Sequence, residues 1–366
     1  MPIKSHLKDL YRVQHIGVSR KGMLRLDMNE ANAALPDNFI ASVLSHIDSD
    51  YLSMYPEYEA LQEKIALSNG LKSENICLSN GSDAAIKYIF DALVSPGDTV
   101  LLTEPTFAMY PVYCKMFGAT IVTVDYAMDL SLPLETYLES ITGAIKLAVI
   151  VNPNNPTGTL IQKDDIVRII KKAQACGVLV IIDEAYFHFC GETVIDKTLE
   201  YDNLIVLRTF SKLCAMASLR IGYAAASAGI IEGLRKVKPT YDVNGVAVLF
   251  ALKLLNTHGL IDSLVREFME GKAFLTDKLA AKGTEYISGN ANFVLIKCPG
   301  EAEHIISSLA RKNILVAGGF KQKMLRDYIR VNIAKRDIME RFFDEFAGVC
   351  ENRRRHEIIK CSQDKS

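Results

Sequence analysis

The chain has 366 residues, 49% of them hydrophobic, and its 42 basic and 43 acidic side chains give a formal net charge of −1. A chain of this length usually forms more than one compact core, so we expect two domains. The balanced charge argues against a nucleic-acid partner, and no apolar run approaches the roughly 20 residues of a membrane span.

The first part of the chain is predicted to be an α/β domain. Residues 1–45 have little strand pattern and are expected to pack on a smaller C-terminal domain, whereas residues 46–256 form the larger domain. Within it, short apolar runs alternate with segments of helical periodicity. The expected strands are residues 75–79, 99–102, 146–151, 178–182, 204–207 and 221–225, with helices at 82–94, from about 108, and at 163–175. This alternation is typical of a mostly parallel central sheet covered by helices.

The pattern changes after about residue 256, and residues 257–350 are predicted to be a second, smaller α+β domain. Its expected helices are residues 260–282, 301–312 and 337–349, and its expected strands are 285–288, 292–296, 314–316 and 329–333. Residues 351–366 are polar and charged. We expect them to form a loose tail, and the sequence leaves its order open.

Polar residues come directly after the predicted strands of the larger domain. Ligands of open parallel sheets bind at the carboxyl ends of the strands, so these turns are expected to share one site. The turns are NGSD at 80–83, NPNNPTG at 152–158, DEAY at 183–186 and TFSK at 209–212, and Arg220 precedes the last strand.

Each turn taken singly also has an ordinary explanation. Ser82 can cap a helix, although free amides at a helix start also bind anions such as phosphate. Asp183 ends a very apolar strand, where a carboxylate is costly unless it caps a helix or meets a cation or hydrogen-bond donors. Lys212 can extend to solvent or act as an amine nucleophile.

Taken together, the segments resemble a known family. The segments are NEANAALP, SMYPEYEAL, LSNGSDAAI, EPTFAMY, NPNNPTG, DEAY, FSKLCAMASLRIGY and YIRVNIA, and they span residues 29–334. With them the sequence resembles the fold-type I, pyridoxal-phosphate-dependent class I/II aminotransferases, in the histidinol-phosphate aminotransferase-like branch. Arg220 follows Lys212 by eight residues, as in that family. The resemblance implies an enzyme that exchanges an amino group between an amino acid, or a related amine, and a 2-oxo acid. The unpaired spacing of the cysteines and the lack of an apolar secretory signal separately predict a cytoplasmic protein.

The resemblance also implies roles around the cofactor, pyridoxal 5′-phosphate. Lys212 forms a Schiff base with it and moves the proton of the substrate, Asp183 pairs with the pyridine nitrogen, and these two residues with Tyr186 form the catalytic set. Asn155 and Tyr186 hydrogen-bond the 3′-oxygen. Phe107 stacks on the ring, with Tyr110 as a second candidate.

The remaining implied contacts concern the phosphate and the substrate. The phosphate is expected at the amides of Ser82 and Asp83, with further donors from Thr209, Ser211 and Arg220. Tyr55 matches the tyrosine that reaches the phosphate of the neighbouring subunit, which implies a homodimer with shared active sites. Arg330 matches the arginine that binds the substrate carboxylate, and Asn29 lies in a segment that closes over the substrate.

Three departures from the family pattern bear on the substrate. Ala31-Asn32 replaces the usual Asn-Pro, and Asn332-Ile333-Ala334 replaces Ile-Gly-Thr. Ala317 stands where members that act on histidinol phosphate have an arginine for the substrate phosphate. This alanine weakens the case for histidinol phosphate as the substrate, and the amino donor, the acceptor and the pathway stay open.

Other functions remain as alternatives. An amino-acid decarboxylase on the same scaffold starts from the same cofactor adduct, and the sequence does not separate the two. A non-catalytic aminotransferase-like domain of a transcription regulator is disfavoured, because the catalytic set is uninterrupted. The seven histidines and eight cysteines show no H-x-x-x-H or C-x-x-C spacing, so we expect reduced thiols and no metal site.

Overall fold

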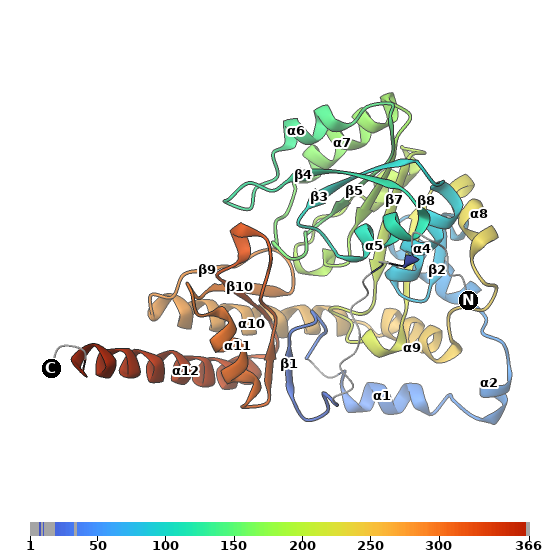
Figure 1. Cartoon of the computed structure of the whole chain (residues 1–366). Helices are drawn as coiled ribbons and strands as arrows, with labels where there is room; N and C mark the ends of the chain where they lie inside the picture. The colour runs from blue at the N-terminus through green and yellow to red at the C-terminus, as the bar shows by residue number, and fades with distance from the viewer. Residues whose placement is uncertain (1–6, 9, 11–18, 33–34, 364–366) are drawn as a thin grey trace.

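The computed structural model describes residues 7–8, 10, 19–32 and 35–363 (Figure 1). In this part of the chain the largest sheet has seven strands in the order β2-β8-β7-β6-β5-β3-β4. Only β8 runs against its neighbours, because β2 and β7 both pair with it in the antiparallel sense and the other pairs are parallel. The predicted α/β fold with a mostly parallel sheet is confirmed. The strands are β2 Ile76–Ser79, β3 Thr99–Glu104, β4 Thr120–Asp125, β5 Ile145–Val151, β6 Leu179–Asp183, β7 Leu204–Thr209 and β8 Gly222–Ala226.

Helices cover both faces of this sheet (Figure 1). The face under α4, α5 and α8 also borders the cavity described in the next subsection, so we call it the cavity face. We call the opposite face, under α3, α6, α7 and α9, the back face. Their bounds are α3 Glu59–Ser68, α4 Ser82–Leu93, α5 Met109–Phe117, α6 Leu134–Ser140, α7 Lys163–Ala175, α8 Ala228–Val237 and α9 Gly245–Asn256. Successive residues of a strand point to opposite faces, so Ile181 packs in the core of the cavity face and Ile182 in that of the back face.

The C-terminal part of the chain is built around smaller sheets. Strand β10 pairs in the antiparallel sense with both β9 and β12, and β1 near the N-terminus pairs in the parallel sense with β11. The expected association of the N-terminal segment with this part of the chain therefore has a physical basis, while the domain boundaries stay a prediction. The elements of this part are β1 Leu24–Leu26, α10 Leu260–Ala281, β9 Tyr286–Ile287, β10 Phe293–Lys297, α11 Ala302–Ala310, β11 Ile314–Val316, β12 Tyr328–Asn332 and α12 Arg336–Gln363. Helices α1 Asp37–Leu44 and α2 Ser49–Ser53 follow β1 in the chain and contact α9.

Several elements differ from the sequence-based expectation, which named no helix at α1, α3, α6, α8 or α9; β4 and α12 differ for a clear physical reason. Strand β4 was not predicted; it lies at the edge of the sheet and five of its six residues are exposed, so it lacks the continuous apolar run of its buried neighbours. Helix α12 continues to Gln363, past the predicted end at residue 349. Residues 350–363 contain no glycine or proline, so this segment has none of the residues that most strongly disfavour a helix.

Helices α9 and α10 are the most apolar pair. In the described part of the chain, no single helix has both the length and the composition that a membrane crossing needs. Helices α9 and α10 meet these two criteria only when taken together, and the chain bends by 85° between them. Five residues of α9 are buried in the protein: Ala247, Val248, Phe250, Ala251 and Leu254. The apolar composition of α9 is therefore accounted for by packing.

Candidate active site

A cavity of about 150 Å³ opens where β5, β6 and β7 end and α4 begins. It collects residues from turns that are far apart in the sequence. Its lining includes ten residues that the sequence analysis assigned to the cofactor: Ser82, Asp83, Phe107, Asn155, Asp183, Tyr186, Thr209, Ser211, Lys212 and Arg220. The structure thus brings the strand-end turns together at one edge of the sheet, as the parallel arrangement predicted.

Asp183 ends β6 and is 2% exposed. Its Oδ2 accepts a hydrogen bond of 2.9 Å from the Tyr110 hydroxyl, and its Oδ1 accepts one of 3.1 Å from the Ala185 amide. Burial raises the pKa of Asp183 to about 6, even though these hydrogen bonds and the charge of Lys212 lower it. This carboxylate therefore lacks enough positive charge nearby, and a cation bound in the cavity would stabilise its ionised form.

Lys212 lies on the turn after β7 and faces the same cavity. Its Nζ is 5.6 Å from the centroid of the Tyr186 ring. The turn is held by Thr209, whose hydroxyl oxygen accepts a hydrogen bond of 3.1 Å from the Ser211 amide. An amine and a buried carboxylate therefore share one cavity, which is the arrangement the sequence analysis required.

The other end of the cavity is shaped for an anion. A Cβ on Gly81 would lie 2.6 Å from Nη2 of Arg220, and a Cβ on Gly222 would lie 2.6 Å from the Ser82 amide nitrogen. Only glycine permits these approaches, which bring the guanidinium of Arg220 against the start of α4. Arg220 also donates a hydrogen bond of 3.4 Å to the Ser211 hydroxyl. The amides at the start of a helix, side-chain hydroxyls and a guanidinium that lie close together can all donate hydrogen bonds to one phosphate group.

The predicted substrate residues are tied to this cavity by hydrogen bonds. Asn29 donates from Nδ2 to the Tyr186 hydroxyl over 2.8 Å, and Arg330 donates from Nη1 to Oδ1 of Asn155 over 2.7 Å. The guanidinium of Arg330 also lies 5.2 Å from the ring centroid of Phe293. Burial lowers the pKa of Arg330, and its Nε has no hydrogen-bond partner among the described residues. A buried cation with an unused donor favours an incoming anion.

Phe107 and Tyr110 have separate positions. Phe107 lines the cavity, as expected of the stacking aromatic. Tyr110, the second candidate for that role, instead donates its hydroxyl to Asp183, and the two rings meet edge to face with centroids 6.2 Å apart. The sequence analysis missed this contact, because which side of α5 faces β6 depends on tertiary packing.

Tyr55 does not line the cavity of its own chain. Its side chain is 73% exposed and stacks on Tyr241, with ring centroids 4.3 Å apart. Leu52 and Met54, on the same segment, are also exposed. The expectation that Tyr55 serves the cavity of a neighbouring subunit therefore stays a prediction.

Ala317 lies directly opposite Arg330. The amide of each residue donates to the carbonyl of the other, over 3.0 and 2.8 Å. Directly opposed residues of an antiparallel pair have side chains on the same face, so the methyl group of Ala317 lies beside the side chain of Arg330. This position next to Arg330 therefore carries no charge.

Among the described residues, no group of three histidine, cysteine, aspartate or glutamate side chains could hold a metal ion. The comparisons with known proteins agree with the geometry. The model of the family "Aminotransferase class I and II" matches residues 21–344. The histidinol-phosphate aminotransferase of Thermoanaerobacter pseudethanolicus is 35% identical over 314 residues, which cover 85% of this chain and 88% of the relative.

Solved structures share the fold. The histidinol-phosphate aminotransferase of Clostridium acetobutylicum has a TM-score of 0.82 at 24% identity, over 90% of this chain and 100% of its own. The enzyme of that name from Sinorhizobium meliloti, in complex with pyridoxal-5′-phosphate, has a TM-score of 0.81 at 22% identity, over 90% of this chain and 91% of its own. At these identities the two structures bear on the fold alone.

Proposed function

This chain belongs to the class I and II aminotransferases, and from that premise we propose that its cavity binds pyridoxal 5′-phosphate (PLP) in the manner set out below. The observation that carries the proposal is that Lys212 and Asp183 line one cavity, and that Ser82 and Arg220 line the same cavity where Arg220 lies against Gly81. The relatives are named as aminotransferases, and nothing in the comparisons favours the decarboxylase alternative.

When bound, PLP supplies a ring that accepts the electron pair left on the substrate Cα after a proton is removed. Asp183 holds the proton on the ring nitrogen, and the positive charge of that nitrogen in turn lowers the pKa of the carboxyl from about 6. Lys212 holds the cofactor through its amine and later carries the proton at Nζ. Phe107 packs against the ring, and Asn155 and Tyr186 donate to its 3′-oxygen.

The phosphate of the cofactor is assigned to the start of α4. The amides of Ser82 and Asp83 point at it from the helix N-terminus, where the helix dipole favours negative charge. Arg220 neutralises the charge, and the hydroxyls of Thr209 and Ser211 add donors; these hydroxyls lie 3.0 Å apart. Anchoring the phosphate fixes the ring relative to Asp183 and Lys212.

The substrate carboxylate is assigned to Arg330, with Asn29 closing over the substrate. Asn155 already bonds Arg330, so one amide side chain connects the cofactor site with the substrate site. Beside Arg330, Ala317 offers no charge for a second anionic group. We infer a substrate pair of an amino acid, or a related amine, and a 2-oxo acid, with a donor other than histidinol phosphate.

The active form is proposed to be a homodimer in which Tyr55 of each chain reaches the cofactor phosphate of the other. The exposed Tyr55–Tyr241 stack supports this, because it presents aromatic surface that a partner would cover. Light scattering on the purified protein tests the proposal, and a fully active monomer would contradict it. A cytoplasmic location and the lack of nucleic-acid and membrane partners stay predictions.

A half-reaction screen tests the function. The PLP-loaded protein is mixed with single amines, histidinol phosphate among them, and the visible absorbance is followed. We expect an amino acid to bleach the band with release of a 2-oxo acid, and a 2-oxo acid to restore it. Release of carbon dioxide without a 2-oxo acid would support a decarboxylase, and rapid turnover of histidinol phosphate would contradict the substrate proposal.

A further inference from the structure

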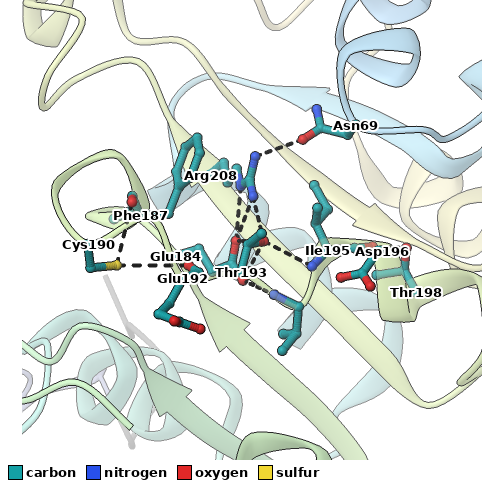
Figure 2. A network of polar contacts seen from close by, with 12 residues as sticks. Asn69, Glu184, Phe187, Cys190, Glu192, Thr193, Ile195, Asp196, Thr198 and Arg208 are labelled. Carbon is teal, nitrogen blue, oxygen red and sulfur yellow. Dashed lines mark hydrogen bonds and ion pairs between the residues drawn. The ribbon is translucent and has the colours of Figure 1, made fainter. Parts of the chain in front are cut away.

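Behind the cavity, a buried ion pair joins the ends of β6 and β7 (Figure 2). Glu184 directly follows β6 and Arg208 is the next-to-last residue of β7. Their side chains are 2% and 4% exposed, and Oε2 of Glu184 accepts hydrogen bonds of 3.0 and 2.9 Å from Nε and Nη2 of Arg208. Glu184 is part of the DEAY segment, but the assignments above give it no role.

The rest of the network fixes the ion pair in place. On the acidic side, Oε1 of Glu184 accepts hydrogen bonds of 2.7 Å from the Val194 amide and 3.0 Å from the Thr193 hydroxyl. On the basic side, Arg208 donates to Oδ1 of Asn69 over 2.8 Å and to the Thr193 oxygen over 2.6 Å. The Phe187 ring centroid lies 3.5 Å from the guanidinium carbon. Both charged groups are therefore held from several sides (Figure 2).

The ion pair is coupled to the cavity through the alternation of the strands. Asp183 faces the cavity, so its neighbour Glu184 points to the back face, and likewise Thr209 faces the cavity while Arg208 points behind. The Glu184 amide also donates to the Leu207 carbonyl over 2.9 Å, which locks the two strand ends together. A shift of either charged residue would therefore move a residue of the cavity with it.

Stability alone is a weak reason for such a pair. Two buried charges lose much of their hydration, and apolar replacements of similar volume often leave a protein equally stable or more stable. A network of directional bonds, in contrast, fixes strand ends more narrowly than apolar packing does. We propose that Glu184 and Arg208 are positioning residues that hold Asp183 and Thr209 in the geometry the cofactor requires. This inference rests on the proposed function, because it concerns residues assigned to PLP.

The central test is the double variant Glu184→Leu/Arg208→Met, which replaces the pair by apolar side chains of similar size. In the PLP-loaded protein we expect kcat to fall on the order of 10-fold to 100-fold, as for a small misplacement of reacting groups, with little change in KM. We also expect a larger dissociation constant for PLP, and a shift of about half a pH unit or more in the titration midpoint of the visible absorbance band. A role in stability alone would leave that midpoint in place.

Two further variants keep the test decisive. Ile169 lies on α7 in the core of the back face. The substitution Ile169→Ala leaves a cavity there that lowers the stability of the protein, and it should leave the titration midpoint and the PLP affinity unchanged. If the double variant does not fold, Glu184→Gln is measured by the same criteria, since it keeps the volume and removes the charge. Arg208→Lys keeps the positive charge but lacks the planar set of donors of a guanidinium. Its kcat, PLP affinity and titration midpoint should therefore lie between those of the parent and the double variant.

The outcomes separate the two proposals. A folded double variant, or Glu184→Gln in its place, with the parent's titration midpoint, PLP affinity and kcat would overturn the positioning role. A shifted midpoint in Ile169→Ala would also count against it, because the midpoint would then follow stability. If the parent itself binds no PLP at Lys212, the proposed function fails before the variants are compared.

Discussion

Asp183 and Glu184 are neighbours in the sequence, yet their carboxylates have opposite surroundings. Glu184, on the back face, is surrounded by a guanidinium, a hydroxyl and an amide. Asp183, on the cavity face, accepts hydrogen bonds from Tyr110 and Ala185 and has no cation in contact among the described residues, and burial raises its pKa to about 6. The difference teaches that burial does not by itself mark a functional charge. The carboxylate that we propose to act on the cofactor is the one whose set of partners is incomplete among the described residues.

The buried arginines Arg208 and Arg330 differ in the same way, since within the described part of the chain one has a complete set of hydrogen-bond partners and the other does not. In Arg208 each of the three guanidinium nitrogens donates a hydrogen bond within the network. In Arg330 the Nε has no partner among the described residues, and burial lowers the pKa of the side chain. We therefore expect Arg330 to gain a ligand and Arg208 to serve the scaffold, and the predictions below test that division.

The largest expected effect is that of Lys212→Ala, which removes the amine that shares the cavity with Asp183. Turnover should fall by more than about 10⁴-fold, because the proton carrier is lost, and the visible absorbance of the PLP-loaded protein should disappear. Lys236→Ala on the surface of α8 is the matched control and should retain both. A Lys212→Ala protein that stays yellow and active would place the reacting amine elsewhere.

Arg330→Ala should have the next largest effect. Without its guanidinium, kcat/KM for amino and 2-oxo acids should fall by about 100-fold, mainly through KM, since a charge-assisted contact is lost. Arg336→Ala, an exposed arginine at the start of α12, provides the control. Steady-state kinetics with one substrate series measure both. Normal substrate affinity in Arg330→Ala would assign the carboxylate to another residue.

The smallest of the three expected effects is a change in the stability of the cofactor-free protein on the substitution Asp183→Asn. Because the folded pKa of about 6 lies above the unfolded value, the stabilisation from protonating Asp183 is complete below about pH 4 and is lost as the pH rises through 6. At pH 8 the asparagine variant should therefore be more stable than the parent by about 2–3 kcal/mol, and this advantage should shrink on acidification. Denaturant unfolding at several pH values measures it, and an advantage that does not depend on pH would contradict the raised pKa.

The amino-acid sequence by itself determined the α/β fold and the residues of the cavity. Local signals sufficed, because buried strands form apolar runs, and the turns after parallel strands meet at one edge of the sheet. Ten of the residues assigned to the cofactor line the cavity; eight of them lie in those turns, Arg220 precedes β8, and Phe107 was assigned from the resemblance to the family. The edge strand β4 gave no such signal, because five of its six residues are exposed, and the polar sequence after residue 350 predicted a loose tail where α12 continues.

Only the tertiary structure decided which charges are paired. Glu184 and Arg208 are separated by 24 residues and meet because of the register between β6 and β7. Tyr110 reaches Asp183 because of the way α5 packs on the sheet. Spacing along a chain fixes which face of a strand a side chain occupies, but the partner it finds there comes from another element, and its distance is set by packing.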